Sequence, residues 1–211
     1  MLNQNQNDTD NIKIILLGNG GVGKTTIINQ YTNDFYSFNP NYMVTYSPNF
    51  VEKIIEIEGK KMIATVWDTA GQEKFNSVSK LFIKNAKIVI LIYDITVKKS
   101  FDDLKYWHDF LNELEQEVIL GIGGNKADLI PEEGYDEEVS EESLIKCANE
   151  WEAEYAILSA KNDKKGIIDF FNKLIRKYMI KNNLVSLTPK KSFQITQKKD
   201  KEEKPSKKCS C

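Results

Sequence analysis

A glycine-rich segment near the N-terminus places the strongest constraint on how this chain can fold. The apolar run IKIILL leads directly into GNGGVGKT, residues 18–25, which matches the pattern G-x-x-x-x-G-K-[ST]. Glycines let the backbone curl so that its N–H groups converge on phosphate oxygens, and a following helix adds its positive N-terminal dipole. The segment therefore predicts a buried strand, a phosphate-binding loop and a helix over residues 24–32 in direct succession.

The rest of the chain alternates between strand-like and helix-like segments. Apolar β-type runs occupy residues 50–59, 61–68, 87–94, 118–124 and 156–161, and the first two flank EGKK, a predicted hairpin. Helical spacing occurs over residues 100–114, 140–155 and 166–180, with Ser100 and Ser140 as predicted N-caps. This alternation predicts an α/β fold with a mostly parallel central sheet, helices on both faces and one antiparallel edge strand.

Charge divides the chain into an acidic body and a basic tail. From residue 181 onward, nine lysines stand against three acidic residues, whereas residues 1–180 carry 20 basic and 28 acidic residues. We predict a flexible N-terminus over residues 1–10, a folded domain over 11–180 and a disordered basic tail over 181–211. An acidic body argues against nucleic-acid binding. Three cysteines without paired spacing predict neither disulfides nor a zinc site, and no signal peptide is recognised at the N-terminus.

Phosphate and metal chemistry is expected from the glycine-rich loop and from the strand that ends at Asp68. Lys24 is expected to reach the β- and γ-phosphates, and Thr25 and Asp68 to hold Mg²⁺. After Asp68, Gly71 can bring a backbone N–H close to the γ-phosphate and Gln72 can orient the attacking water. The predicted phosphate contacts come from Gly20, Gly21, Val22, Gly23, Lys24, Thr25 and Thr26.

Base recognition is expected from NKAD, which follows the strand-like segment VILGI. The Asp128 carboxylate can accept hydrogen bonds from N1 and N2 of guanine, and adenine offers no equivalent donors there. Lys126 can lie along the ring, and Asn125 can tie this loop to the phosphate loop. A further contact to the base is expected after the next strand, from Ser159, Ala160 and Lys161. An ATP-using enzyme is disfavoured by Asp128.

The motifs GNGGVGKT, WDTAGQEKF, NKAD and SAK, in this order, resemble those of the Ras-like small GTPases. WDTAGQEKF, LIYDIT and SFDDLKYW are most similar to the Rab family of membrane-traffic switches. The resemblance covers residues 10–180 and the last three residues, and it implies a single P-loop GTPase domain that binds GTP or GDP with Mg²⁺. It also implies a monomer on the cytoplasmic face of an intracellular membrane, cycling with the cytosol. The implied partners are an exchange factor, an activating protein that supplies an arginine, a GDP dissociation inhibitor, an escort protein and effectors.

Under this resemblance, Thr45 matches the switch threonine that meets Mg²⁺ and the γ-phosphate, which makes Lys24, Thr45 and Gln72 the implied catalytic set. The stretch TYSPNF replaces the usual T-I-G-x-x-F, so unusual effectors are expected. The spacing from Lys24 to Thr45 is longer than in the family. The aromatic that stacks on guanine is therefore either Tyr36 or Phe38, and Phe38 is favoured.

Two further sequence features are the cysteines at the C-terminus and the presence of a single arginine. Cys209-Ser210-Cys211 has the Cys-x-Cys form of Rab-like chains, which implies a geranylgeranyl group on each cysteine. The alternative is a polar tail with incidental cysteines. The chain's one arginine, Arg176, lies within the last predicted helix, so we expect slow intrinsic hydrolysis. A GTP-binding module without turnover remains the alternative function.

Overall fold

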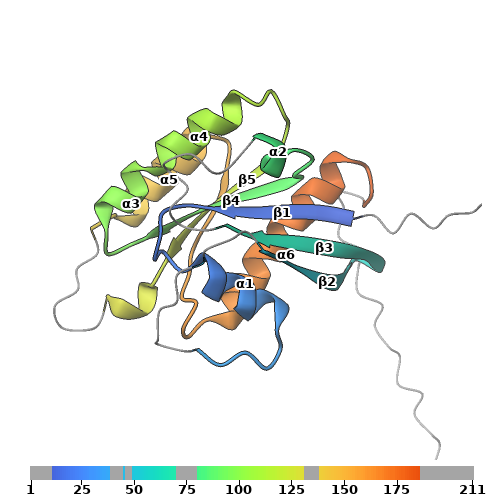
Figure 1. Ribbon diagram of the computed structural model, residues 1–211, viewed down its shortest axis with the longest axis horizontal. Helices are drawn as coiled ribbons and strands as arrows, with labels where there is room; N and C mark the ends of the chain where they lie inside the picture. Colours follow the sequence, from blue (N-terminus) through green and yellow to red (C-terminus); the bar gives the residue numbers. More distant parts are fainter. Residues whose placement is uncertain (1–10, 39–44, 46–48, 70–79, 131–137, 186–211) are drawn as a thin grey trace, which may run out of the picture.

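A six-stranded sheet forms the centre of the computed structural model, which describes residues 11–38, 45, 49–69, 80–130 and 138–185. The strand order is β2-β3-β1-β4-β5-β6 (Figure 1). Only β2 runs antiparallel to its neighbour, β3, and the other pairs are parallel. The predicted α/β class and the antiparallel edge strand are therefore confirmed. The strands are β1 (Asn11–Leu17), β2 (Asn49–Ile57), β3 (Lys60–Asp68), β4 (Ile88–Asp94), β5 (Ile119–Asn125) and β6 (Glu154–Ile157).

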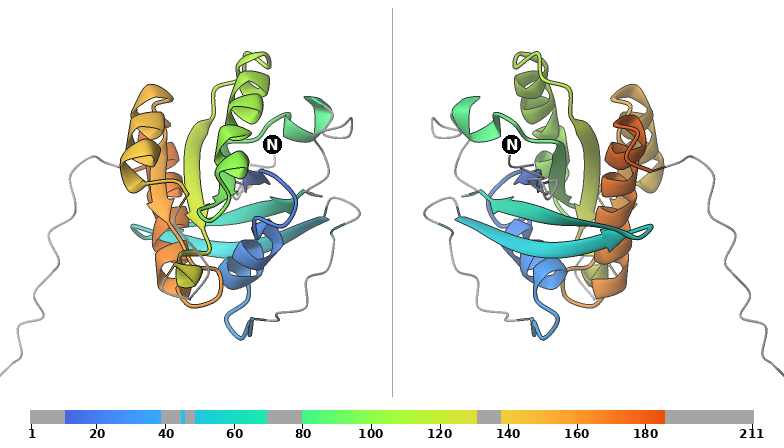
Figure 2. Two further views of the ribbon diagram at one scale, coloured as in Figure 1. Left: turned by 90° about the vertical axis from the view of Figure 1, so that its left-hand side faces the viewer. Right: turned by 90° about the vertical axis from the view of Figure 1, so that its right-hand side faces the viewer.

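Helices cover both faces of this sheet. The helices are α1 (Lys24–Thr32), α2 (Lys80–Ile83), α3 (Lys98–Asp102), α4 (Leu104–Asn112), α5 (Glu141–Glu150) and α6 (Lys164–Lys181), with a 3₁₀ turn, η2, at Ala127–Leu129. One core cluster joins the sheet to α1 and α6, and the other joins it to α2, α4 and α5. In Figure 2, α4 in green and α6 in orange lie on opposite sides of β4 and β5. All seven residues of β4 are buried, as expected for a strand covered on both faces.

The predicted hairpin and two helix starts agree with the structure. β2 and β3 are joined at Glu58 and Gly59, whose φ angles of 53° and 81° suit the tight turns that connect twisted strands. Helix α1 has the predicted bounds of residues 24–32. Ser140 caps α5, because its side chain accepts a hydrogen bond from the Ser143 N–H.

The predicted cap at Ser100 is wrong. Helix α3 begins at Lys98, and Ser100 lies inside it, buried against the end of β4. The Ser100 hydroxyl accepts from the Asp94 N–H at 2.9 Å and donates to the Val97 carbonyl at 2.7 Å. The hydroxyl thus binds strand and helix together instead of starting the helix.

Two predicted boundaries also differ from the structure. The single helix expected over residues 100–114 is divided at Asp103 into α3 and α4. Helix α5 ends at Glu150, and Glu152 adopts a left-handed φ of 52°, which turns the chain into β6 earlier than predicted.

Within the described part of the chain, no helix is long and apolar enough to cross a bilayer.

Candidate functional site

The loops that carry the motifs meet at the carboxyl ends of the parallel strands. The glycine-rich loop follows β1, Asp68 ends β3, and Asn125 ends β5. Because β1, β3, β4 and β5 run in the same direction, these ends share one edge of the sheet (Figure 1). This edge is where ligands bind in open α/β sheets.

Two glycines of the phosphate loop are required by its close packing. A Cβ at Gly18 would lie 2.1 Å from the Ile92 carbonyl oxygen, and one at Gly23 would lie 2.3 Å from Asn125 Nδ2. Gly23 also has a φ of 97° and precedes α1 without a side-chain cap on that helix. The first turn of α1 therefore has no side-chain acceptor at its cap, as expected of an anion-binding helix start.

Lys24 is held within this loop. Its side chain is buried, and Nζ donates to the carbonyl oxygens of Gly18 at 2.8 Å and Asn19 at 3.1 Å. These bonds fix the ammonium group inside the curve of the loop. The predicted role of Lys24 in binding phosphate requires a cation at this place.

The three residues predicted to hold Mg²⁺ lie together. Thr25 Oγ1 donates to Asp68 Oδ2 at 2.6 Å and lies 3.0 Å from Thr45 Oγ1. Asp68 Oδ1 is buried and has no hydrogen-bond partner among the described residues. Burial raises the pKa of the Asp68 carboxyl, and the Thr25 hydrogen bond and the Lys24 charge offset only part of that effect.

This donor set fits a small hard cation. Carboxylate and hydroxyl oxygens suit Mg²⁺, and Asp68 Oδ1 is an acceptor to which none of the described residues donates a hydrogen bond. In the described ranges, no group of three or more His, Cys, Asp or Glu residues is arranged for a metal. A cation at this site would therefore depend on two hydroxyls and one carboxylate, completed by phosphate oxygens and water.

Asn125 connects the two ends of the site, as predicted. Its Nδ2 donates to the Val22 carbonyl at 2.8 Å, and its Oδ1 accepts from the Ala160 N–H at 3.0 Å. The side chain is buried, so both bonds are shielded from water. The phosphate loop and the loop after β6 are thereby held in one arrangement.

The residues predicted to read the base also lie together. Ser159 Oγ donates to Asp128 Oδ1 at 2.6 Å, and Lys161 Nζ lies 3.8 Å from Asp128 Oδ2. Lys126 has a left-handed φ of 72°, and its Nζ contacts Asp94 Oδ2 at 2.6 Å. These contacts set the positions of Asp128 and Lys126, the two side chains predicted to contact guanine.

Asp94 is a site residue that the motif analysis missed. It ends β4 and is buried, and its other oxygen accepts from the N–H and hydroxyl of Thr96 at 3.0 and 2.7 Å. Its position at a strand end, like that of Asp68, was a signal available in the sequence. Because one oxygen is bound by Thr96, the other is held in place to orient Lys126.

The remaining predicted residues are placed only in part. Tyr36 is half-buried and Phe38 is 38% exposed, and neither is assigned to the base by its contacts, so Phe38 stays a prediction. The stretch that precedes β2 is described at Thr45 but not at residues 46–48. Gly71, Gln72, Cys209 and Cys211 also lie outside the described residues.

Comparison with known proteins identifies related sequences. The model of the Ras family matches residues 13–180. The chain is 36% identical to Ras-related protein Rab-30 of Homo sapiens over 194 residues, covering 87% of this chain and 91% of the relative. It is 33% identical to Ras-related protein Rab-13 of Canis lupus familiaris over 174 residues, 81% of each chain. It is 32% identical to Ras-related protein SEC4 of Saccharomyces cerevisiae over 195 residues, covering 88% of this chain and 84% of the relative.

Proposed function

Because this chain belongs to the Ras family and is a Rab-like small GTPase of membrane traffic, we propose that it is a slow switch whose GTP state binds effectors. Turnover without a partner is slow, and an activating protein accelerates it by supplying an arginine. The observation that carries this proposal is the convergence of Thr25, Thr45 and Asp68 next to the buried Lys24.

At the phosphate end, the chain supplies positive charge and N–H donors. Lys24 binds the β- and γ-phosphates from within the loop, and the first turn of α1 adds N–H donors. Thr25, Thr45 and Asp68 would hold Mg²⁺, which neutralises charge on these phosphates when bound. Gln72 orients the attacking water.

At the base end, the chain selects guanine. The Asp128 carboxylate accepts from N1–H and N2–H of the base, while Ser159 holds the carboxylate in place. Lys126, oriented by Asp94, lies along the ring. Asn125 keeps this end at a fixed position relative to the phosphate loop, so one rigid edge binds both ends of the nucleotide.

Thr45 provides the link between nucleotide and switch. Its hydroxyl meets the Thr25 hydroxyl at 3.0 Å, so residue 45 can sense whether the phosphate and metal site is filled. Loss of the γ-phosphate would remove a partner from Thr45. The resemblance to the Ras-like GTPases implies that the switch segments, about residues 39–50 and 69–84, would then be released; most of both segments lies outside the described residues. Effectors that bind the GTP arrangement would then dissociate.

A single-turnover assay tests the function itself. We expect the purified full-length chain to hydrolyse bound GTP when Mg²⁺ is present, and to lose most of this activity when the ion is chelated. ATP, offered in parallel, should be neither bound tightly nor hydrolysed, because it lacks the donors that Asp128 accepts. Binding of GTP without any turnover would identify a nucleotide-binding module instead, and turnover of ATP would contradict the assignment of the base site.

Attachment to membranes is proposed to depend on lipids carried by Cys209 and Cys211. One lipid chain anchors only marginally, whereas two chains hold firmly, and the tail lysines add an attraction to anionic lipid that salt screens. We expect the Cys209→Ser/Cys211→Ser variant, expressed in a eukaryotic cell, to move from the membrane pellet to the soluble fraction.

Cys147 in α5 provides the matched control for this experiment. Burial, together with the nearby charge of Glu150, raises the pKa of the Cys147 thiol to about 11, so this thiol is a poor nucleophile at neutral pH. The Cys147→Ser variant should remain on membranes like the unaltered chain. A tail variant that still sediments with membranes after a high-salt wash would show that the tail cysteines do not anchor the protein.

A further inference from the structure

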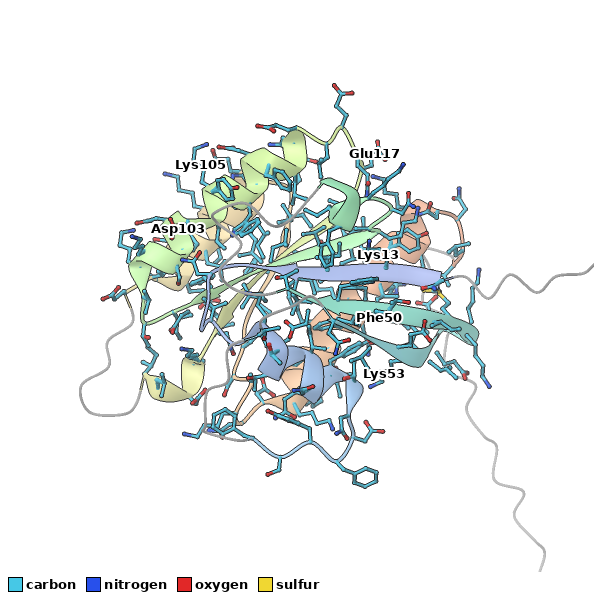
Figure 3. The ribbon with its side chains drawn as sticks, viewed as in Figure 1. Lys13, Phe50, Lys53, Asp103, Lys105 and Glu117 are labelled. Carbon is cyan, nitrogen blue, oxygen red and sulfur yellow. The ribbon has the colours of Figure 1, made fainter. Side chains whose placement is uncertain are left out.

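A hydrogen bond connects the phosphate loop to the junction between two helices. Asn19, the second residue of the loop, donates from Nδ2 to Asp103 Oδ2 at 2.8 Å, across 84 positions of sequence. Asp103 is the residue at which α3 ends and α4 begins. Figure 3 labels Asp103 at this junction, next to the turn that follows β1. The phosphate loop is therefore bound by the segment SFDDLKYW, which contains none of the four nucleotide motifs.

Asn19 is in turn connected to the phosphate-binding lysine. Its carbonyl oxygen accepts from Lys24 Nζ at 3.1 Å, alongside the Gly18 carbonyl at 2.8 Å. A shift of the Asn19 backbone would move one of the two carbonyls that hold the ammonium group. The hydrogen bond of the Asn19 side chain therefore affects the position of Lys24 through the Asn19 backbone, although the two side chains are not hydrogen-bonded to each other.

Asn19 has little other support for its amide group. Its Oδ1 is buried and has no hydrogen-bond partner among the described residues, so the bond to Asp103 is what orients the side chain there. Without this bond, the buried Oδ1 and the partly buried Nδ2 would both lack a partner among the described residues, which is costly. Because the acceptor is a charged carboxylate, the bond belongs to the stronger class.

We propose that Asp103 is a positioning residue that holds the phosphate loop, through Asn19, in the shape that retains the bound nucleotide. This inference rests on the proposed function, since it requires that the loop bind the phosphates of GTP and GDP. Asp103 acts through Asn19 and Lys24 and does not contact the nucleotide. Its effect is to slow nucleotide release, which sets how long the switch stays in one state.

A reciprocal exchange of the two side chains tests the pairing. The Asn19→Asp variant places two carboxylates in contact, so release of a fluorescent GDP analogue from the full-length protein should accelerate about tenfold, the size expected for losing a hydrogen bond to a charged group. The Asp103→Asn variant keeps an acceptor and should show a smaller increase. In the double variant the donor and acceptor are reversed, and release should return to within about twofold of the unaltered rate.

The exchange separates pairing from charge. Both Asn19→Asp and the double variant carry an added carboxylate beside the phosphates, so repulsion of GDP alone would accelerate release equally in the two. Equal rates in these variants, or an unchanged rate in Asn19→Asp, would overturn the proposal. The nearly isosteric Asp103→Asn variant keeps the test valid if Asn19→Asp fails to fold.

Asp102 offers a matched control one position away. It is exposed and forms an ion pair with Lys98 one helical turn earlier, at 3.1 Å. The Asp102→Asn variant loses one negative charge beside the same helix junction and should release the analogue at the unaltered rate. Faster release by this variant would point to a general charge effect. Failure of the unaltered chain to bind the analogue at all would instead contradict the proposed function.

Discussion

Replacing Asp128 with asparagine is expected to shift the nucleotide preference of this protein from guanine to xanthine. Ser159 Oγ donates to Asp128 Oδ1, and the amide oxygen of an asparagine can keep that bond. The amide nitrogen then occupies the place of Oδ2, where it would face the N1–H and N2–H donors of guanine. Donors facing donors leave buried polar groups unpaired, and affinity for GTP should fall about a hundredfold or more.

Xanthine presents a carbonyl where guanine has its amino group, so the new amide gains a partner. We therefore expect the Asp128→Asn variant to bind xanthosine diphosphate more tightly than GDP, measured by competition against a fluorescent nucleotide. Asp163, which caps α6 by accepting from the Gly166 N–H at 2.8 Å, provides a control in a neighbouring loop. Asparagine is an equally good cap, so Asp163→Asn should leave the preference unchanged. Unaltered GDP affinity in the Asp128→Asn variant would refute the assignment of this carboxylate to the base.

The sheet and the helix after the phosphate loop could be predicted because their signals are local. The glycine loop imposes a strand before it and a helix after it, and the long apolar runs of β4 and β5 suit strands buried on both faces. Boundaries that depend on tertiary contacts could not be predicted in this way. Serine is a common N-cap residue, but the Ser100 hydroxyl is hydrogen-bonded to Asp94 at the end of β4. This contact forms between segments only when the chain is folded.

The same distinction applies to the site. Asn125 could be assigned to the phosphate loop because two motifs that follow parallel strands must meet at one edge of the sheet, and its bond to Val22 confirms this. The partners of Lys126 and Asn19 could not be assigned. Asp94 and Asp103 lie outside the nucleotide motifs, and their pairing depends on how β4 and α3 pack against distant loops.

Slow intrinsic hydrolysis, with acceleration only by a partner that inserts an arginine, is the other large effect that we expect. An arginine at the transferring phosphate accelerates this reaction by about 10³–10⁵-fold. The chain's one arginine, Arg176, donates from Nε to Glu58 at 2.6 Å, in the turn between β2 and β3. Asp68 lies at the other end of β3, about 26 Å from that turn at the usual rise of a strand. Lysine lacks the planar fork that grips two oxygens, so the many lysines of this chain are poor substitutes.

We therefore expect the isolated protein to hydrolyse GTP at about 10⁻⁴ to 10⁻³ s⁻¹ in a single-turnover assay, as do relatives without an internal arginine. The Arg176→Ala variant should turn over at the same rate, because the residue it alters is bound to the far end of the β2–β3 hairpin. A Glu58→Gln variant controls for loss of that ion pair without loss of the arginine. Addition of a Rab-directed activating protein should accelerate GTP hydrolysis by the unaltered protein and by both variants. An activator whose own arginine has been replaced should not accelerate it. Fast turnover by the isolated chain that collapses in Arg176→Ala would show that the chain supplies its own arginine after all.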